Sequence, residues 1–158
     1  MVSIENTIKN IVPNSVLILS SEGEWALHDL LPLLLSVTGP ANVSVASFSI
    51  SEEAVRCFMF EQEKGNILNL RCLLDYTMRS HKVDLMLFLE FIADELKTAP
   101  NHSKLILIEN TDFKIAVVGS ANLTPNPRLE LAIVFCNSPE FLTLNRIFSE
   151  AWNNSTPF

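Results

Sequence analysis

The sequence predicts an α/β fold, a mixed β-sheet with helices on both faces, and three observations indicate it. Short apolar runs of strand type alternate with segments of helical periodicity over much of the chain. A group of strands then follows before the last helix. Several runs, such as VLILS (16–20), are apolar almost without interruption, which is typical of strands covered on both sides.

The elements expected in the first half have clear start or stop signals. Gly39-Pro40 is a standard stop signal for a helix. Ser51, followed by two glutamates, is typical of an N-cap with acidic residues in the first helical turn. The expected elements are a strand at 16–20, a helix at 23–38, a strand at 42–50, and a helix that begins after Ser51 and runs to about Lys64-Gly65.

The second half is expected to contain two helices and four strands. Residues 83–98 have apolar positions at helical spacing, and Pro100 closes this helix. Pro139 suits the first position of the last helix. The expected elements are a strand that begins the segment 67–78 and whose far end is ambiguous, a helix at 83–98, strands at 102–109, 113–119 and 129–136, and a helix at 138–153.

Length and composition favour one globular domain, 1–158. The chain of 158 residues is 48 % hydrophobic and 18 % charged, which is typical of a compact protein and not of a disordered one. The formal net charge is −7. This charge argues against a broad basic face for non-specific nucleic-acid binding, but it is compatible with a small basic cleft, because steering depends on local charge.

Cysteine spacing and hydropathy indicate the cellular compartment of the protein and whether it enters a membrane. Cys57, Cys72 and Cys136 are odd in number and widely spaced, so we expect buried, inert thiols instead of a disulfide framework or a zinc site. The most apolar stretch, LLPLLLSV, is far shorter than a membrane span, and the first residues do not resemble a signal peptide. We therefore expect a cytoplasmic location and no integral membrane association.

A predicted β-hairpin brings polar residues together. Residues 110–112, Asn-Thr-Asp, are turn residues between two apolar strands, so 102–109 and 113–119 should pair. We expect Glu109 to lie opposite Phe113. Side chains at alternate positions share a face, and opposed side chains lie about 5 Å apart. This register places His102 across from Ser120, Lys104 across from Val118, and Asn122 on the same face as Ser120.

These residue types suit phosphate chemistry. A neutral imidazole, here His102, can attack phosphorus as a nucleophile and form a covalent intermediate. Lys104 can hold a phosphate oxygen as a point charge. Glu130, at the start of the next strand, can orient the imidazole. Further donors to the phosphate oxygens are Ser120, Asn122 and the backbone at Gly119.

The spacing of these residues resembles the signature of the phospholipase D superfamily, whose usual form is H-x-K-x4-D-x6-G-S-x-N. The chain reads His102-Ser103-Lys104 and later Gly119-Ser120-Ala121-Asn122. The stretch NPRLE, which ends in Glu130, and the stretch ASFSIS (46–51) are also similar to family segments. Two features depart from the pattern, because Glu109 replaces the usual Asp and the stretch before the glycine is longer. Asp112 is an alternative candidate for the missing role.

The resemblance implies a phosphodiesterase that needs neither a metal nor a cofactor and acts through a phosphohistidine. Family members use one histidine as the nucleophile and a second as the general acid. This chain has the motif once, and His28 and His81 lie outside it and are interpreted as structural. Compact members with a single motif form homodimers, so the resemblance implies a homodimer with one His102 from each chain in a shared active site.

The substrate and even the activity stay open at this point. A nucleic-acid substrate, DNA or RNA, is slightly preferred because the compact form resembles the endonuclease-like branch. A lipid substrate is less favoured, because the sequence has no amphipathic basic helix. The alternatives are a non-catalytic module that uses the fold for dimerisation or nucleic-acid binding within a larger assembly, and a synthase or transferase that uses the same intermediate.

Overall fold

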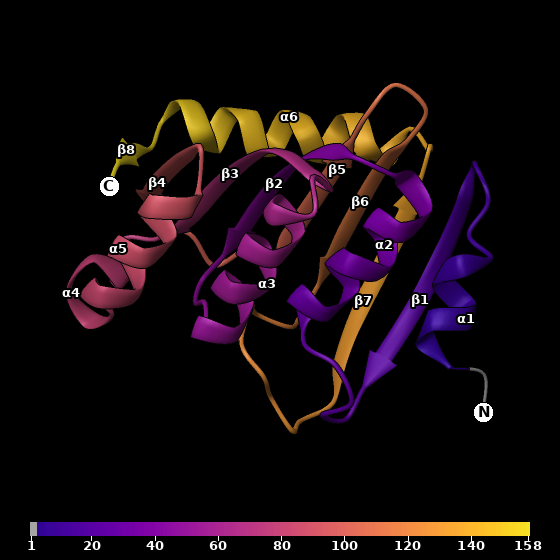
Figure 1. Cartoon of the computed structure of the whole chain (residues 1–158), viewed down its shortest axis with the longest axis horizontal. Coiled ribbons are helices and arrows are strands. Elements are labelled where there is room, and N and C mark those ends of the chain that lie inside the picture. Colours follow the sequence, from indigo (N-terminus) through magenta and orange to yellow (C-terminus); the bar gives the residue numbers. More distant parts are fainter. Residues whose placement is uncertain (1–2) are drawn as a thin grey trace.

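In the computed structural model, which describes residues 3–158, eight strands form a single mixed sheet with the order β1-β7-β6-β5-β2-β3-β4-β8 (Figure 1). Strands β2, β3 and β4 run parallel to one another, and the other neighbours pair antiparallel. The predicted mixed sheet is therefore confirmed. The strands are β1 (Ser15–Ser21), β2 (Ala41–Ser47), β3 (Ile67–Asp75), β4 (Glu95–Ala99), β5 (Leu105–Glu109), β6 (Lys114–Gly119), β7 (Glu130–Cys136) and β8 (Thr156–Pro157).

Helices cover both faces of the sheet, as predicted. Helices α1, α2, α3 and α5 pack against one face and bury the larger apolar cluster. In the part of the chain that the structure describes, α6 is the helix that packs against the other face, where Phe141, Phe148 and Trp152 are buried. The helices are α1 (Ile4–Lys9), the 3-10 turn η1 (Leu27–Asp29), α2 (Leu30–Thr38), α3 (Glu52–Glu63), α4 (Met78–His81), α5 (Val83–Ile92) and α6 (Glu140–Asn153).

The helix predicted at 83–98 is wrong in its second half. Helix α5 ends at Ile92, and Glu95–Ala99 forms the strand β4, parallel to β3. The carboxylate of Asp94 accepts a hydrogen bond from the backbone of Leu70 at 2.7 Å, and this contact directs the chain into the sheet. A run of five residues is too short for its period to distinguish a strand from the end of a helix, so the tertiary pairing decides.

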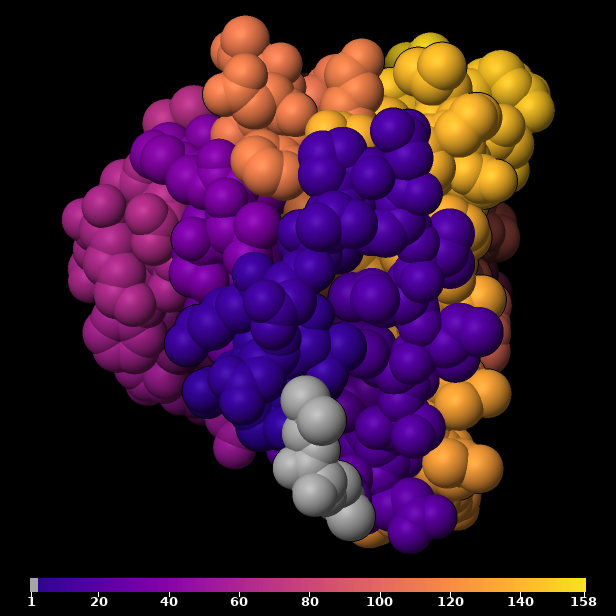
Figure 2. Space-filling model, turned by 90° about the vertical axis from the view of Figure 1, so that its right-hand side faces the viewer, coloured from indigo at the N-terminus to yellow at the C-terminus, as the bar shows by residue number. Residues whose placement is uncertain are grey.

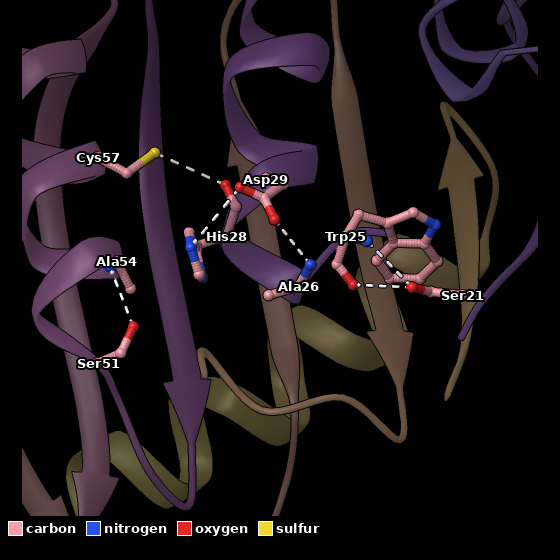
Figure 3. Close-up of polar contacts among 8 residues, drawn as sticks. All are labelled: Ser21, Trp25, Ala26, His28, Asp29, Ser51, Ala54 and Cys57. Carbon is pink, nitrogen blue, oxygen red and sulfur yellow. Dashed lines mark hydrogen bonds and ion pairs between the residues drawn. The ribbon is translucent and has the colours of Figure 1, made fainter. Parts of the chain in front are cut away.

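The other boundaries also differ from the predictions. Residues 23–26 are not helical, because the Ser21 hydroxyl accepts a hydrogen bond from the Trp25 backbone and donates one to the Trp25 carbonyl (Figure 3). The strand that begins at Ile67 ends at Asp75. Helix α1 and strand β8 were not predicted. Strand β5 begins only at Leu105, so residues 102–104 precede it as irregular chain.

The register predicted for the hairpin is wrong by one residue. Glu109 lies opposite Lys114, not Phe113, and Leu105 lies opposite Val118. The reason is the turn, where the Asn110 backbone donates to the Phe113 carbonyl at 2.9 Å and the Asn110 side chain accepts from the Phe113 backbone. These bonds place Asn110 and Phe113 across from each other, and the turn closes one residue wider than expected.

Candidate active site

The strand directions bring five chain segments to one edge of the sheet, the lower edge in Figure 1. Strands β2 and β3 end at this edge, β5 begins there, β6 ends there and β7 begins there. All six predicted site residues lie in these segments. His102 and Lys104 directly precede β5, Gly119 ends β6, Ser120 and Asn122 follow it, and Glu130 begins β7.

His102 and Lys104 are in direct contact. The Lys104 Nζ lies 2.9 Å from His102 Nδ1 and donates to the His102 carbonyl at 2.6 Å. A charged ammonium can only donate, so Nδ1 is the acceptor, and a neutral ring in this contact carries its proton on Nε2. Burial lowers the pKa of Lys104, and the charge of Glu130 opposes this shift. His102 is exposed and Lys104 is half-buried.

Ser120 and Glu130 form a second polar group beside this pair. The Ser120 hydroxyl donates to Glu130 Oε2 and accepts the backbone N–H of Leu131 at 3.0 Å. The other carboxylate oxygen of Glu130 accepts from the side chain of Asn126 at 2.6 Å. Glu130 is only 8 % exposed. Its oxygens are therefore engaged by Ser120 and Asn126 in this chain, and its expected role beside an imidazole stays a prediction.

Gly119 and Asn122 complete the group of predicted residues. A Cβ atom on Gly119 would lie 2.3 Å from the Leu131 carbonyl oxygen, so a glycine is required where β6 meets the start of β7. Asn122 is half-buried, and its Oδ1 lies 3.4 Å from the hydroxyl of the buried Ser47. The structure thus brings all six residues to one edge, although the predicted opposition of His102 to Ser120 and of Lys104 to Val118 is wrong. Instead, the Gly119 backbone donates to the Lys104 carbonyl at 3.3 Å.

Two residues that sequence reasoning missed hold the segment that carries His102. Asp75, at the end of β3 and 5 % exposed, accepts the backbone N–H of Asn101 at 3.0 Å. The side chain of Asn101 donates to the carbonyls of Ser47 and Leu73 and accepts the Ser103 backbone N–H. These bonds fix the chain on both sides of His102. Asn101 has no signature beyond its position before the motif.

The groups around the Asp75 carboxylate also set its pKa. Burial raises the pKa of Asp75, but hydrogen bonds from Thr77 and Asn101 and the positive charge of His102 together outweigh it, so the pKa lies below its ordinary value. A second missed contact is the ring of Phe48, whose centroid lies 4.9 Å from that of His102. Phe48 belongs to the stretch ASFSIS, so the sequence did contain a signal for this contact.

Two residues are candidates for the role of the Asp in the usual motif, and both lie at the opposite edge of the sheet from the site. Glu109 forms an exposed ion pair with Lys114, with the charged atoms 3.5 Å apart. Asp112 is exposed in the hairpin turn, and its backbone donates to the Asn110 side chain. Both positions are at the turn end of the hairpin, so the departures from the usual pattern do not alter the site edge.

His28 and Cys57 form a separate group between η1 and α3, in which His28 is buried and Cys57 is half-buried (Figure 3). His28 is 5 % exposed, its Nε2 lies 3.7 Å from Asp29 Oδ1, and burial lowers its pKa. The Cys57 thiol donates to the His28 carbonyl at 3.7 Å, and burial raises its pKa to about 12. Such a thiol is inert. Cys72 and Cys136 are buried as expected, but Cys57 is only half-buried.

Within residues 3–158, no three His, Cys, Asp or Glu side chains are grouped so that they could hold a metal ion. None of the helices described in those residues is long and apolar enough to cross a bilayer.

Comparison with known proteins shows the fold but gives no sequence match. No protein-family model matches the chain, and no curated protein matches its sequence. Among solved structures, it is similar to Nuc from Salmonella typhimurium, a phospholipase D family member, with 19 % identity and a TM-score of 0.67 over 91 % of this chain and 97 % of that one. NucT from Helicobacter pylori gives 17 % identity and a TM-score of 0.69, covering 91 % of this chain and 99 % of NucT.

A third similar structure belongs to a different kind of protein. TrmBL2, an archaeal chromatin protein whose structure shows a novel mode of DNA binding, gives 11 % identity and a TM-score of 0.63. The match covers 96 % of this chain but 57 % of TrmBL2. At these identities the three likenesses show a shared fold.

Proposed function

Because the chain has the fold of the phospholipase D superfamily, we propose that it is a phosphodiesterase of phospholipase D type, which acts without a metal in a homodimer. One observation carries the proposal: the contact between His102 and Lys104 lies at the same sheet edge as Ser120, Asn122 and Glu130. Imidazole, ammonium, hydroxyl and amide groups at one edge are the groups that phosphoryl transfer through a histidine needs.

In the first step, Nε2 of one His102 attacks phosphorus, and the bond from phosphorus to the leaving oxygen breaks. The partner's His102 donates a proton to that oxygen, so the leaving group departs as an alcohol. Lys104 and the side chains of Ser120 and Asn122 hold the other phosphate oxygens and stabilise the charge that builds there. The product of this step is a phosphohistidine.

Lys104 controls which ring nitrogen is free. While its ammonium donates to Nδ1, the proton of a neutral His102 ring is on Nε2, so Nε2 has no free lone pair for attack. The general acid is the partner's His102 in its imidazolium form, in which both ring nitrogens are donors and Nδ1 cannot accept from Lys104. A phosphate competes with Nδ1 for Lys104. When Lys104 turns to the phosphate, the ring proton can move to Nδ1 and leave the Nε2 lone pair free for attack. Substrate binding therefore activates the nucleophile.

In the second step, the partner's His102, now neutral, takes a proton from water. The hydroxide attacks the phosphohistidine, and the bond between phosphorus and His102 Nε2 breaks. An alcohol in place of water would give transfer instead of hydrolysis, so product analysis with an added alcohol distinguishes the two outcomes.

A nucleic acid is the substrate class that we propose to test first. The support is the likeness to Nuc and NucT over nearly the full length of both proteins. The net charge of −7 argues for contacts to a few phosphates near Lys104, because a chain this acidic repels a long polyanion elsewhere on its surface.

The test is hydrolysis of bis(p-nitrophenyl) phosphate in the presence of a chelator. We expect turnover by the wild type, and a loss of about 1,000-fold or more in kcat for His102→Ala, because the nucleophile and the acid are both removed. His81→Ala is the matched control, because His81 is exposed at the end of α4 and lies outside the motif. Equal rates for wild type and His102→Ala would contradict the proposal.

The likeness to TrmBL2 favours a second candidate function, a non-catalytic module that binds DNA through this fold. This candidate predicts no hydrolysis by either the wild type or His102→Ala, together with binding of a DNA duplex that both proteins retain. A fluorescence anisotropy titration with labelled DNA, run beside the hydrolysis assay, distinguishes the two candidates.

A further inference from the structure

A polar cleft lies on the face of the sheet that α6 covers. Its volume is about 260 Å³. Ser44 of β2, Arg71 of β3 and Glu95 of β4 line it side by side, because Ser44 lies opposite Arg71 and Arg71 lies opposite Glu95. The cleft is also lined by three amide side chains, those of Asn42, Asn69 and Asn145.

The cleft is separate from the candidate active site. Asn42 and Asn69 lie near the starts of β2 and β3, whose ends form the site edge, so the cleft lies toward the opposite edge of the sheet. That edge is the upper one in Figure 1, and in the side view the orange β5–β6 hairpin turn and the yellow α6 both lie there (Figure 2). Further along the same strands, Ala46 and Leu73 point to the same face and belong to the apolar cluster under α6. The polar residues therefore interrupt a face that is otherwise apolar.

Arg71 is held in a fixed position in this cleft. Its Nε and Nη2 donate to the Ser44 hydroxyl at 3.2 and 3.1 Å, and Ser44 is 6 % exposed. The guanidinium carbon lies 5.4 Å from the centroid of the Phe148 ring and 5.5 Å from that of the Trp152 ring. A guanidinium has five N–H donors, and those of Nη1 take no part in the contact with Ser44. The half-buried Arg71 is thus a pre-organised cation with donors left for a ligand.

Arg71 and Glu95 do not pair with each other, although they are neighbours in the sheet. Within residues 3–158, neither of them takes part in an ion pair. Lys97, two positions further along β4, does not neutralise Glu95, because its Nζ lies 4.7 Å from the centroid of the Trp152 ring and donates to the Trp152 carbonyl at 3.4 Å. One cation and one anion therefore line the cleft without a charged partner.

We propose that the cleft binds a free α-amino acid with a polar side chain. Arg71 donates to the carboxylate of the ligand, Glu95 accepts from its ammonium, and the three amide groups bond its side chain. Neighbouring strands are about 4.8 Å apart, so the two opposite charges of the ligand must also be close together. In an α-amino acid a single carbon separates them, whereas in a peptide they lie at the two ends of the chain.

The charges in the cleft argue against other small ligands. A phosphate or a larger polyanion would meet Glu95 and also Glu109, which lines the same cleft. A cation without a carboxylate would leave the half-buried Arg71 unpaired and lie beside it. An apolar ligand would remove water from both charges and from the amides without replacing the lost hydrogen bonds. A ligand with one charge of each sign complements the cleft.

Isothermal titration calorimetry tests the proposal with four probes: L-serine, L-threonine, L-asparagine and L-glutamine. We expect at least one of them to bind with one molecule per chain. Its N-acetyl derivative lacks the ammonium and its α-amide derivative lacks the carboxylate, so each should bind about tenfold or more weakly. Inorganic phosphate should not bind in the cleft. If none of the four amino acids binds, or if both derivatives bind as tightly as the amino acid, the proposal is wrong.

A variant of Arg71 assigns the binding to this cleft. Arg71→Gln should abolish binding of the amino acid, because the carboxylate then has no charged donor. Arg56→Gln is the matched control, since Arg56 also lies over an aromatic ring, that of Phe88, but outside the cleft. Binding that survives in Arg71→Gln, or that is lost in Arg56→Gln as well, would overturn the proposal.

A variant of Glu95 tests the second contact and does not depend on the stability of Arg71→Gln. Glu95 is exposed, so Glu95→Gln should fold like the wild type. This variant should bind the amino acid and its N-acetyl derivative equally, because the ammonium no longer meets a carboxylate. A preference for the free amino acid that stays as large as in the wild type would show that Glu95 does not bind the ammonium, and would refute the proposed recognition of both charges.

Discussion

At the scale of single residues, the segment that carries His102 is fixed by polar groups from the neighbouring strands. Asp75 holds the backbone of Asn101, and the Asn101 side chain bridges the ends of β2 and β3 to Ser103. An exposed imidazole on irregular chain would otherwise sample many positions. The buried Asp75 carboxylate therefore pre-organises the proposed nucleophile, as catalytic geometry requires.

Asp75→Asn should destabilise the protein in a pH-dependent way. Removing a charged acceptor from Thr77 and Asn101 should cost about 1–3 kcal/mol at neutral pH. The pKa of Asp75 is lowered in the folded state, so its contribution is present above its ordinary value of 3.8 and is lost as the pH falls through the lower folded value. Urea unfolding of wild type and variant at a series of pH values measures this difference.

The two unfolding curves should therefore converge in acid. A difference that stays constant from neutral pH to below 3.8 would show that the charge of Asp75 is not what stabilises the loop. Asp112→Asn is the control, because Asp112 is exposed in the hairpin turn and its side chain is remote from the site edge.

Residues of the site differ in how well the sequence predicts them. His102, Lys104, Ser120 and Asn122 stand at short, fixed spacings, so a local pattern identifies them. Asp75 acts on a residue 26 positions away, and only the parallel arrangement of β4 beside β3, with Ala99 opposite Asp75, brings the two segments together. The strand order that causes this contact leaves no local trace in the sequence.

At the scale of the elements, local sequence signals predict a helix or strand correctly where a residue beside it caps its end. Ser51 caps α3 as predicted, with its hydroxyl accepting the Ala54 backbone N–H at 3.3 Å (Figure 3). The prediction for β4 is wrong because no residue within 95–99 disfavours a helix. The pairing with β3 that makes this segment a strand depends on residues outside it. The predicted hairpin register is wrong for a related reason, because the Asn110 side chain accepts a hydrogen bond that stabilises a wider turn.

Ser51→Ala should destabilise the protein by about 1 kcal/mol, because it leaves a backbone N–H of the first turn of α3 without its acceptor. Thermal unfolding followed by circular dichroism measures the effect. Ser36→Ala is the matched control, since Ser36 is exposed on α2 and bonds only within its own helix. A loss in Ser36→Ala as large as in Ser51→Ala would contradict the capping argument.

At the scale of the whole molecule, the two faces of the sheet are covered unequally. The larger cluster lies under α1, α2, α3 and α5, whereas α6 covers the centre of the other face and leaves Val16, Ile18 and Leu131 exposed on β1 and β7. The sequence predicted helices on both faces but not this asymmetry, because it depends on the strand order, which the sequence does not reveal.

A mixing experiment tests whether two chains share one site. If each active dimer needs two copies of His102, adding an equal amount of His102→Ala to the wild type should reduce the activity to about half after subunits exchange, because only about a quarter of the dimers then contain two wild-type chains. Hydrolysis of bis(p-nitrophenyl) phosphate at a fixed amount of wild type measures this. The activity measured directly after mixing, before subunits exchange, is the control and should be unchanged. Chains that work alone would stay insensitive to the added variant at all times, and a shared cleft would then be refuted even if the fold and the phosphohistidine chemistry stand.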